Sequence, residues 1–475
     1  MPGVPGLARS GDFRTSYVFF PSVRVPFPSG NETNPMSSPA IKEPVQADAT
    51  KDFFVNMLTR DILLHDCVLD LADNSIDGAN RVLATRKTTP PEATRYAEFE
   101  VKIDASAAEF SIVDNCGGIS VDLAKNKVFY FGRPKGVIDP LDYSIGLYGI
   151  GMKRALFKMG TYSEIESSTE TEGFRVVIDV LAWVAMIPWI FELERVAKFD
   201  PPGTRIVVKR LKDECATQFG DSTFLRMLKW IVARDYSFFL QKGMRISING
   251  SEILPHKFEL RTGDELEPVH FTYLDDGVNV SISAGLANLP DEDTGPSEER
   301  SGVDYFGWFV VCNDRIVLAA DKTPKTVWGD DGFAVWHPQY NGFMGIVSFD
   351  SNDPSQLPWA TTKRDVDKAS PVYQRAIARM KTATKQYIAY SNARKSAITE
   401  SKEAEARSHP VSVKELKPAT TMRLPTVATT SAYVTISYQA ARTDVKKVAA
   451  ALGSPSMAAT KVGKKTFNYY MENEL

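Results

Sequence analysis

Short runs of β-branched and aromatic residues alternate with amphipathic helical segments along residues 50–212. The β-type runs are FEVKID at 99–104, EFSIVD at 109–114, RVVIDV at 175–180 and TRIVVKRL at 204–211. The longest helical pattern begins at residue 64, where apolar positions recur every three or four residues and form one continuous face. Helical and strand patterns mixed in this way predict an α/β sandwich.

A second block follows a helical stretch at 222–240. Its strand-like runs are MRISINGSEI at 244–253, FGWFVVCNDRIVL at 306–318 and GFMGIVSFD at 342–350. Asn249-Gly250, in the first of these runs, is a turn signal typical of β-hairpins. We therefore expect a second β-rich domain after the first.

The remaining patterns complete the expected division of an α+β chain. Residues 1–49 are rich in Pro, Ser and Gly and predict a flexible N-terminal arm. The small C-terminal unit is expected to contain a strand at 432–438, a helix at 443–452 and a basic, aromatic end. The predicted parts are, in order, the arm, a first domain at 50–215, a second domain at 216–370, one long polar helix at 371–406, a Pro- and Thr-rich linker at 407–430 and the C-terminal unit at 431–475.

Composition narrows the class of protein. The 475 residues include 56 Lys and Arg against 59 Asp and Glu, which excludes a bulk polycation. Four cysteines without a CxxC pair, and five histidines, argue against a zinc knuckle or a disulfide framework and favour a reducing cytoplasm. We expect no membrane span, since no run of about eighteen apolar residues occurs. The charge is uneven: residues 401–475 carry a net +5 and the preceding 400 residues a net −8.

The helical segment DCVLDLADNSIDGAN, residues 66–80, spaces its polar side chains regularly. Asp70, Asn74 and Asp77 fall at positions i, i+4 and i+7, away from the apolar face. Three polar groups in one column can meet a ligand together. An amphipathic helix with a solvated polar face has the same pattern, so this motif alone leaves both interpretations open.

Two further motifs place glycine beside a strand end. In FSIVDNCGGIS, a strand ends at Asp114, whose carboxylate can accept a hydrogen bond from the amino group of a base. Gly118 permits close approach of the backbone to a ligand. In PPGTRIVVKRL, Gly203-Thr204 opens another strand. Ordinary turns have the same patterns.

A glycine-rich loop leads into a helical pattern at residues 143–160. Gly146, Gly149 and Gly151 form the sequence GxxGxG, with Lys153 just inside the helix. Backbone N–H groups of such a loop can bind phosphates, and Lys153 would add a positive charge. The loop is neither a Walker sequence, which requires GxxxxGK[ST], nor a convincing dinucleotide fingerprint.

These motifs, followed by Thr362-Lys363 in LPWATTKRDVD, stand in an order that resembles the GHKL ATPases. That superfamily includes gyrase B, the ninety-kilodalton heat-shock chaperone, histidine kinases and MutL. The resemblance covers residues 50–370 and is closest to MORC-like prokaryotic ATP-binding proteins. It implies a Bergerat-type α/β sandwich ATPase domain at 50–215, followed by a β-α-β transducer domain at 216–370 and a helical, flexible C-terminal tail.

The resemblance also implies ligands for each motif. Asn74 would bind the Mg²⁺ that bridges the phosphates of ATP, and Asp77 would line the same helix one turn on. Asp114 would accept a hydrogen bond from the adenine amino group, while Gly118 would let the base lie against the backbone. Thr204 would complete the adenine site.

The phosphate end of the expected site departs from the family in one respect. Residues from Gly146 to Lys153 would form the lid over the β- and γ-phosphates, and Lys363 would reach the γ-phosphate when the two domains close. Asp70 stands where the family has its hydrolytic glutamate and is one methylene shorter. General-base assistance contributes about 10²–10⁴-fold, so we expect slow hydrolysis, or binding without turnover. A second departure is Cys116 in the first glycine position of the usual DxGxG.

Together these observations predict a Mg²⁺-dependent ATPase that works as an ATP-gated switch. We expect ATP to drive homodimerisation, with residues near 45–62 exchanged between protomers. Two biological roles for this switch stay open. One is a clamp on nucleic acid in genome maintenance or phage defence, and the other is a chaperone-like or signalling module acting on a protein client. The basic, aromatic sequence VGKKTFNYY at 462–470 fits DNA binding, but such residues also pack against a partner.

Overall fold

The computed structural model describes most of the chain from Thr50 to Glu474. The described ranges are 50–88, 90–131, 149–288, 305–360, 363–395, 398–425 and 436–474. The expected flexible arm at 1–49 lies outside them, as do Gly146, Thr362 and parts of the expected linker and of the strand at 432–438.

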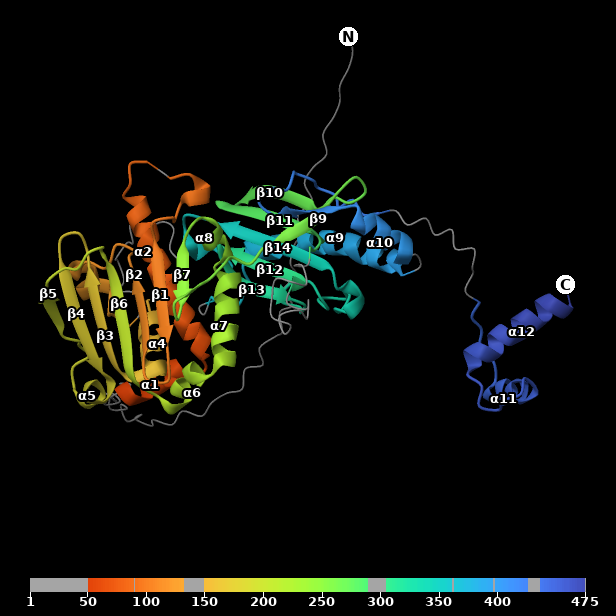
Figure 1. Ribbon diagram of the computed structural model, residues 1–475, viewed down its shortest axis with the longest axis horizontal. Helices are drawn as coiled ribbons and strands as arrows, with labels where there is room; N and C mark the ends of the chain where they lie inside the picture. The colour runs from red at the N-terminus through yellow and green to blue at the C-terminus, as the bar shows by residue number, and fades with distance from the viewer. Residues whose placement is uncertain are drawn as a thin grey trace, which may run out of the picture. The chain divides into compact units, whose positions relative to one another are not determined.

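Eight strands form a mixed sheet in the order β5-β4-β3-β6-β2-β1-β7-β8 (Figure 1). Neighbouring strands pair antiparallel, except that β1 and β7 run parallel. The strands are β1 Glu100–Ala105, β2 Phe110–Asp114, β3 Gly160–Ser168, β4 Gly173–Asp179, β5 Leu193–Val196, β6 Gly203–Leu211, β7 Arg245–Ile248 and β8 Ser251–Glu252.

Helices accompany this sheet, as the mixed sequence pattern predicted. Helices α2 and α4 pack against each other and against strands β2, β3 and β6. The apolar face of α2 is fully enclosed, with Cys67, Val68 and Ile76 at 0% exposure. The helices are α1 Lys51–Thr59, α2 Leu64–Ala84, α3 Val121–Leu123, α4 Gly151–Met159, α5 Val180–Ala185, α6 Asp213–Gly220, α7 Ser222–Asp235 and α8 Ser237–Gln241, with a 3₁₀ turn at Glu92–Thr94 and a π-helical turn at Ala124–Val128.

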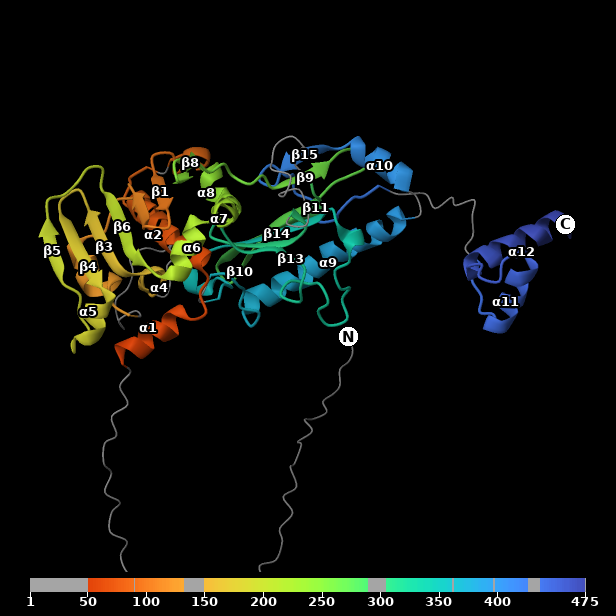
Figure 2. The same cartoon turned by 60° about the horizontal axis from the view of Figure 1, so that its bottom comes forward.

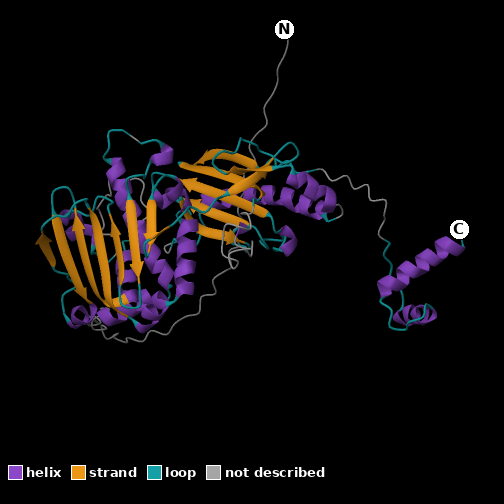
Figure 3. Cartoon of the chain, in the orientation of Figure 1, coloured by secondary structure: helices purple, strands orange, loops and turns teal. Residues whose placement is uncertain are grey.

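A second sheet has five strands in the order β10-β11-β14-β12-β13. Helix α9 packs along β11 and β14 (Figure 2), and Figure 3 distinguishes the two sets of strands from the helices. The elements are β9 Glu259–Thr262, β10 Val269–Asp275, β11 Val278–Leu286, β12 Gly307–Cys312, β13 Arg315–Asp321, β14 Phe343–Asp350, α9 Pro371–Arg394, α10 Ile398–Ala406 and β15 His409–Ser412, with 3₁₀ turns at Pro338–Tyr340 and Pro354–Gln356. The chain is therefore α+β, and β15 and β9 form a separate two-stranded ladder.

The strand expected to open the second block belongs to the first sheet instead. Strand β7 pairs with β1, with Val101 opposite Ile246, because Ile246 and Ile248 are fully buried in the core beneath that sheet. The predicted hairpin turn is confirmed. Asn249 and Gly250 connect β7 to β8, and both have the positive φ that this turn requires.

Three other expectations need correction. Residues 371–406 form two helices, and α9 is not polar throughout, because Val372, Tyr373, Ala376 and Met380 turn inward at helical spacing. The parallel strands β12 and β14 are connected through β13 and a 3₁₀ turn, so this connection contains no α-helix of the β-α-β kind.

The C-terminal unit is described from residue 436. Residues 436–438 are not in a strand, since they pair with no neighbouring strand among the described residues. The expected helix is confirmed as α11 Arg442–Ala451, and α12 Ala459–Asn473 follows it. Among the helices of the described ranges, none combines the length and the hydropathy that crossing a membrane would need.

Candidate functional site

Helix α2 carries the central polar residues, and most of them are buried. Fourteen of its 21 residues are enclosed, including Asp70, Asp73 and Asp77, whereas Asn74 is exposed. A solvated polar face is therefore the wrong interpretation for Asp70 and Asp77. Charged side chains are rarely buried unless they are paired, so each buried carboxylate points to a specific set of neighbours.

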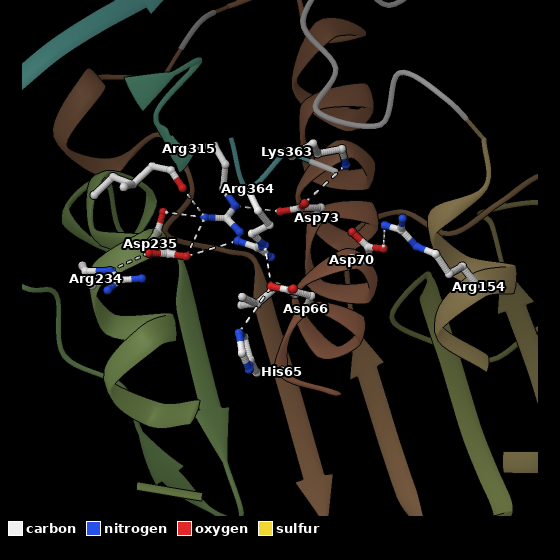
Figure 4. A network of polar contacts seen from close by, with 12 residues as sticks. His65, Asp66, Asp70, Asp73, Arg154, Arg234, Asp235, Arg315, Lys363 and Arg364 are labelled. Atoms are coloured by element: carbon white, nitrogen blue, oxygen red, sulfur yellow. Dashed lines mark hydrogen bonds and ion pairs between the residues drawn. The ribbon is translucent and has the colours of Figure 1, made fainter. Parts of the chain in front are cut away.

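Asp70 faces the start of helix α4. Its Oδ2 accepts a 2.6 Å hydrogen bond from Nη2 of Arg154 (Figure 4). A Cβ added to Gly151 would lie 3.3 Å from the Asp70 carboxyl carbon, so the absence of a side chain there lets the two helices approach closely. Burial raises the pKa of Asp70 above its ordinary value, against the opposing charges of Lys363 and Arg154. A carboxylate with a raised pKa is suited to act as a general base near neutral pH.

The glycine-rich loop supplies the first turn of α4. Gly149 has φ +65°, a conformation that glycine adopts readily, and the helix begins at Gly151. Ile150 at the N-cap offers no side-chain acceptor, so its side chain does not cap the first backbone N–H groups. Such groups are suited to bind phosphate oxygens.

Lys153 lies inside the protein, whereas the sequence placed it in the lid over the phosphates. Its side chain is 1% exposed, and Nζ donates hydrogen bonds of 2.6 Å to the carbonyl oxygens of Val128 and Tyr130. Burial lowers the pKa of Lys153 to about 7. The lysine thus ties α4 to the π-helical turn, because it lies close to the buried face of the helix. Arg154, one residue on, points toward Asp70.

Asp114 ends strand β2 and is held by three donors. Its Oδ1 accepts from the backbone N–H groups of Cys116 at 2.9 Å and Thr204 at 3.2 Å. Its Oδ2 accepts from the hydroxyl of Ser75 on α2 at 2.7 Å. The Thr204 hydroxyl lies 3.0 Å from that of Ser167 on β3. Burial raises the pKa of Asp114, while these hydrogen bonds to its ionised form oppose the rise.

Gly118 is required by the packing of two neighbouring strands. It has φ +67°, and a Cβ there would lie 2.0 Å from the carbonyl oxygen of Ser168 and 3.0 Å from that of Gly203. The close neighbours of Gly118 are therefore protein backbone, and its approach to a ligand stays a prediction. Cys116, in the glycine position of the family motif, is a buried residue whose thiol pKa is raised by burial.

Lys363, which lies between β14 and α9 in the chain, contacts α2. Its Nζ lies 3.3 Å from Oδ2 of Asp73, and only 8% of the residue is exposed. The residue has φ +55°. Lys363 is also the charge that most opposes the raised pKa of Asp70. The sequence-distant lysine and the candidate base therefore lie in one electrostatic environment.

A buried ion network lies beside this lysine, and sequence reasoning missed it (Figure 4). Arg315 on β13 is fully buried and donates to Asp73 at 3.0 Å, while its second partner is Asp235 at 3.1 Å. Tyr236 donates a 2.7 Å hydrogen bond to the same oxygen of Asp73. Burial would raise the pKa of Asp73, but Lys363 and Arg315 hold it below its ordinary value.

Arg364 extends the network to the start of α2. It contacts Asp235 at 3.1 Å and Asp66 at 2.9 Å. No spacing rule links these positions in the sequence, and the one local signal was that Arg364 directly follows Lys363.

The structure thus gathers most of the predicted residues around one helix. Asp70, Asn74 and Asp77 lie on α2, and Gly151 and Lys363 contact its acidic residues. Ser75 joins α2 to Asp114, which also binds the backbone of Thr204, and Gly118 lies beside the strand that begins at Gly203. Neither the protein-family models nor the curated proteins that were searched contain a match to this chain.

Proposed function

We propose that the chain binds ATP with Mg²⁺ at the face of α2 and hydrolyses it, as a GHKL-type ATPase built on a Bergerat-type domain. The observation that carries the proposal is the carboxylate of Asp114, fixed by three donors at a strand end and joined to α2 through Ser75. Each of the other predicted motifs within the described residues places a residue near α2 or near Asp114.

Asp114 supports recognition of adenine in particular. A carboxylate has about four acceptor positions, and the hydrogen bonds from Ser75, Cys116 and Thr204 leave one for an incoming donor. The exocyclic amino group of adenine donates at that position. Guanine has a carbonyl oxygen there, which would face a carboxylate oxygen without a proton between them. The pocket should therefore prefer ATP to GTP.

Asn74 fits the role of a magnesium ligand. Its side chain is exposed, and no hydrogen bond to it occurs within the described ranges. Mg²⁺ usually keeps several waters and takes only one or two protein oxygens in addition to substrate phosphates. The described residues contain no group of three or more Asp, Glu, His or Cys side chains that could hold a metal alone. When bound, Mg²⁺ would neutralise phosphate charge and shape the triphosphate.

Asp70 would supply the general base for hydrolysis. A water oxygen bonds to the γ-phosphorus as the bond to the β,γ-bridging oxygen breaks, and the electron pair leaves with ADP. The water proton passes to the Asp70 carboxylate. Lys363 offers a positive charge beside the same helix, and phosphoryl transfer depends mainly on such positioning and charge neutralisation. The backbone N–H groups at the start of α4 would bind phosphate oxygens.

The buried network supports a switch as the output of this site. Lys363 and Arg364 follow the second sheet in the chain and bind Asp73 and Asp66 on α2. A change at the phosphates would reach the second sheet through Asp73 and its ion pair with Arg315 on β13. ATP-driven homodimerisation, and the choice between a nucleic-acid clamp and a protein client, stay predictions.

The test of the proposal is nucleotide binding by Asp114→Asn. The amide presents a donor to the adenine amino group in place of an acceptor, so we expect ATP affinity to fall roughly 100-fold, as for loss of a charged hydrogen bond with an unpaired donor left behind. Titration of a fluorescent ATP analogue measures it, with GTP as competitor. Asp104→Asn, an exposed position on neighbouring β1, is the matched control. Unchanged ATP affinity in Asp114→Asn would refute the assignment.

A further inference from the structure

Arg154 is the basic partner of Asp70, the candidate base, and lies on the helix into which the glycine-rich loop leads. It lies in α4, three residues after Gly151, and its Nη2 donates a 2.6 Å hydrogen bond to Asp70. Its Nε is buried and has no hydrogen-bond partner within the described residues. An unsatisfied guanidinium nitrogen is costly to bury, and a guanidinium fork is well matched to phosphate oxygens.

We propose that ATP binding transfers Arg154 from Asp70 to the γ-phosphate, so that the substrate itself frees the base. The inference rests on the proposed function. Without a γ-phosphate, Arg154 neutralises Asp70 and holds its oxygen in an ion pair. With ATP, the phosphate oxygens compete for the guanidinium and also satisfy Nε. Asp70 then turns to the attacking water. ADP lacks the γ-phosphate and leaves the ion pair in place.

Nucleotide affinities test this transfer. We expect Arg154→Gln to weaken binding of a non-hydrolysable ATP analogue roughly tenfold, the equivalent of one charge-assisted hydrogen bond, and to leave ADP affinity unchanged. Asp70→Asn should strengthen the analogue's binding, because the competing carboxylate is gone. Arg154→Lys should restore part of the preference for the triphosphate. Lys158→Gln removes a cation from the same helix, where its partner is Glu214 at 3.7 Å, and serves as the matched control.

The pH dependence of hydrolysis separates transfer from a fixed ion pair. The profile of kcat/KM reports the free enzyme and that of kcat the substrate complex. If Arg154 leaves Asp70 in the complex, Arg154→Gln shifts the inflection of kcat/KM to higher pH and leaves that of kcat in place. Equal shifts in both profiles, or equal loss of ATP-analogue and ADP affinity, would overturn the inference. Wild-type protein that binds no nucleotide would instead refute the proposed function.

A second, independent inference concerns helices α11 and α12. Within them only Ala449 and Val462 are buried, whereas Phe467, Tyr469, Tyr470 and Met471 are about half exposed. Burial of one Val-sized side chain contributes about 1.5–3 kcal/mol, against roughly 1–2 kcal/mol to fix the backbone of each residue. The two helices therefore share a small core and leave their aromatic side chains available to a partner surface.

We infer that this partner is single-stranded nucleic acid. Six exposed cations lie on the two helices, namely Arg442, Lys446, Lys447, Lys461, Lys464 and Lys465. The three aromatic rings follow the last lysines on α12 within two turns. Lysine is depleted at protein interfaces, whereas lysines beside exposed rings match a charged backbone with bases that stack.

Binding of the full chain to an oligothymidylate tests this inference. We expect Lys461→Gln/Lys464→Gln/Lys465→Gln to reduce the salt dependence by about 0.7 in log–log slope per lysine. Phe467→Ala/Tyr470→Ala should lower affinity roughly tenfold per ring at an unchanged slope. Lys385→Gln/Lys402→Gln, exposed on α9 and α10, is the control for charge. No binding at low salt, an equal loss in the control, or equal binding to polyglutamate, which marks an acidic protein partner, would overturn it.

Discussion

Replacing Asp70 by Asn is expected to lower the rate of ATP hydrolysis by about 10²–10⁴-fold, the usual contribution of a general base, while ATP stays bound. The amide keeps the size of the side chain and removes its ability to accept the water proton. Phosphate release under saturating ATP measures the rate. Asp61→Asn, an exposed carboxylate just before α2, should be as active as wild type.

The same residue sets the expected pH dependence. The base must be ionised, so hydrolysis is lost as pH falls through the pKa of Asp70, which burial raises above the ordinary aspartate range. Lys363→Ala removes the charge that most favours the ionised form and should move this loss to higher pH. If Asp70→Asn kept both the wild-type rate and its acid limb, Asp70 would not be the base.

Substituting Arg315 by Met is expected to lower the free energy of unfolding by about 3–5 kcal/mol, the cost of breaking a buried ion pair by removing one partner. Arg315 is fully enclosed and serves both Asp73 and Asp235. The Met side chain has similar length but leaves these carboxylates with fewer partners. Denaturant unfolding measures the change.

A surface arginine provides the control for this substitution. Arg375 pairs with Asp275 and Asp276, but its side chain is 42% exposed. Arg375→Met should cost about 0–1 kcal/mol, because exposed ion pairs contribute little. Equal losses in the two variants would mean that the buried network does not stabilise the fold.

Local chemistry allowed most of the candidate site to be predicted from the sequence. Asp114 and Thr204 meet because each lies at the end of a strand, and the strands pair in register. Asp70 and Asn74 share a helix whose spacing is fixed. The orientation of α4 could also have been predicted from its sequence. Arg154 lies opposite the apolar face of Met152, Leu156 and Met159 on a helical wheel, whereas Lys153 borders that face.

Long-range pairing is what the sequence could not reveal. The parallel ladder between β1 and β7 joins residues that are far apart in the sequence. A hydrophobic run alone does not indicate which sheet its strand will join. The sequence around Arg315 likewise predicts only a residue at the start of a strand, after a turn. Arg315 can be buried because Asp73 and Asp235 both lie beside it. Their positions depend on how the two sheets pack.

Arg315 and Asp73 are separated by 242 positions in the chain, yet each is a charged partner of the other in a fully buried place. A neutral residue at one position takes one charged partner from the other and leaves Asp73 with Lys363, or Arg315 with Asp235, so changes at the two sites should be tolerated best when they occur together. The pair would thus covary among homologous sequences. Asp73 adjoins Asn74 on α2, so this coupling would make residues of the second sheet change together with residues of α2.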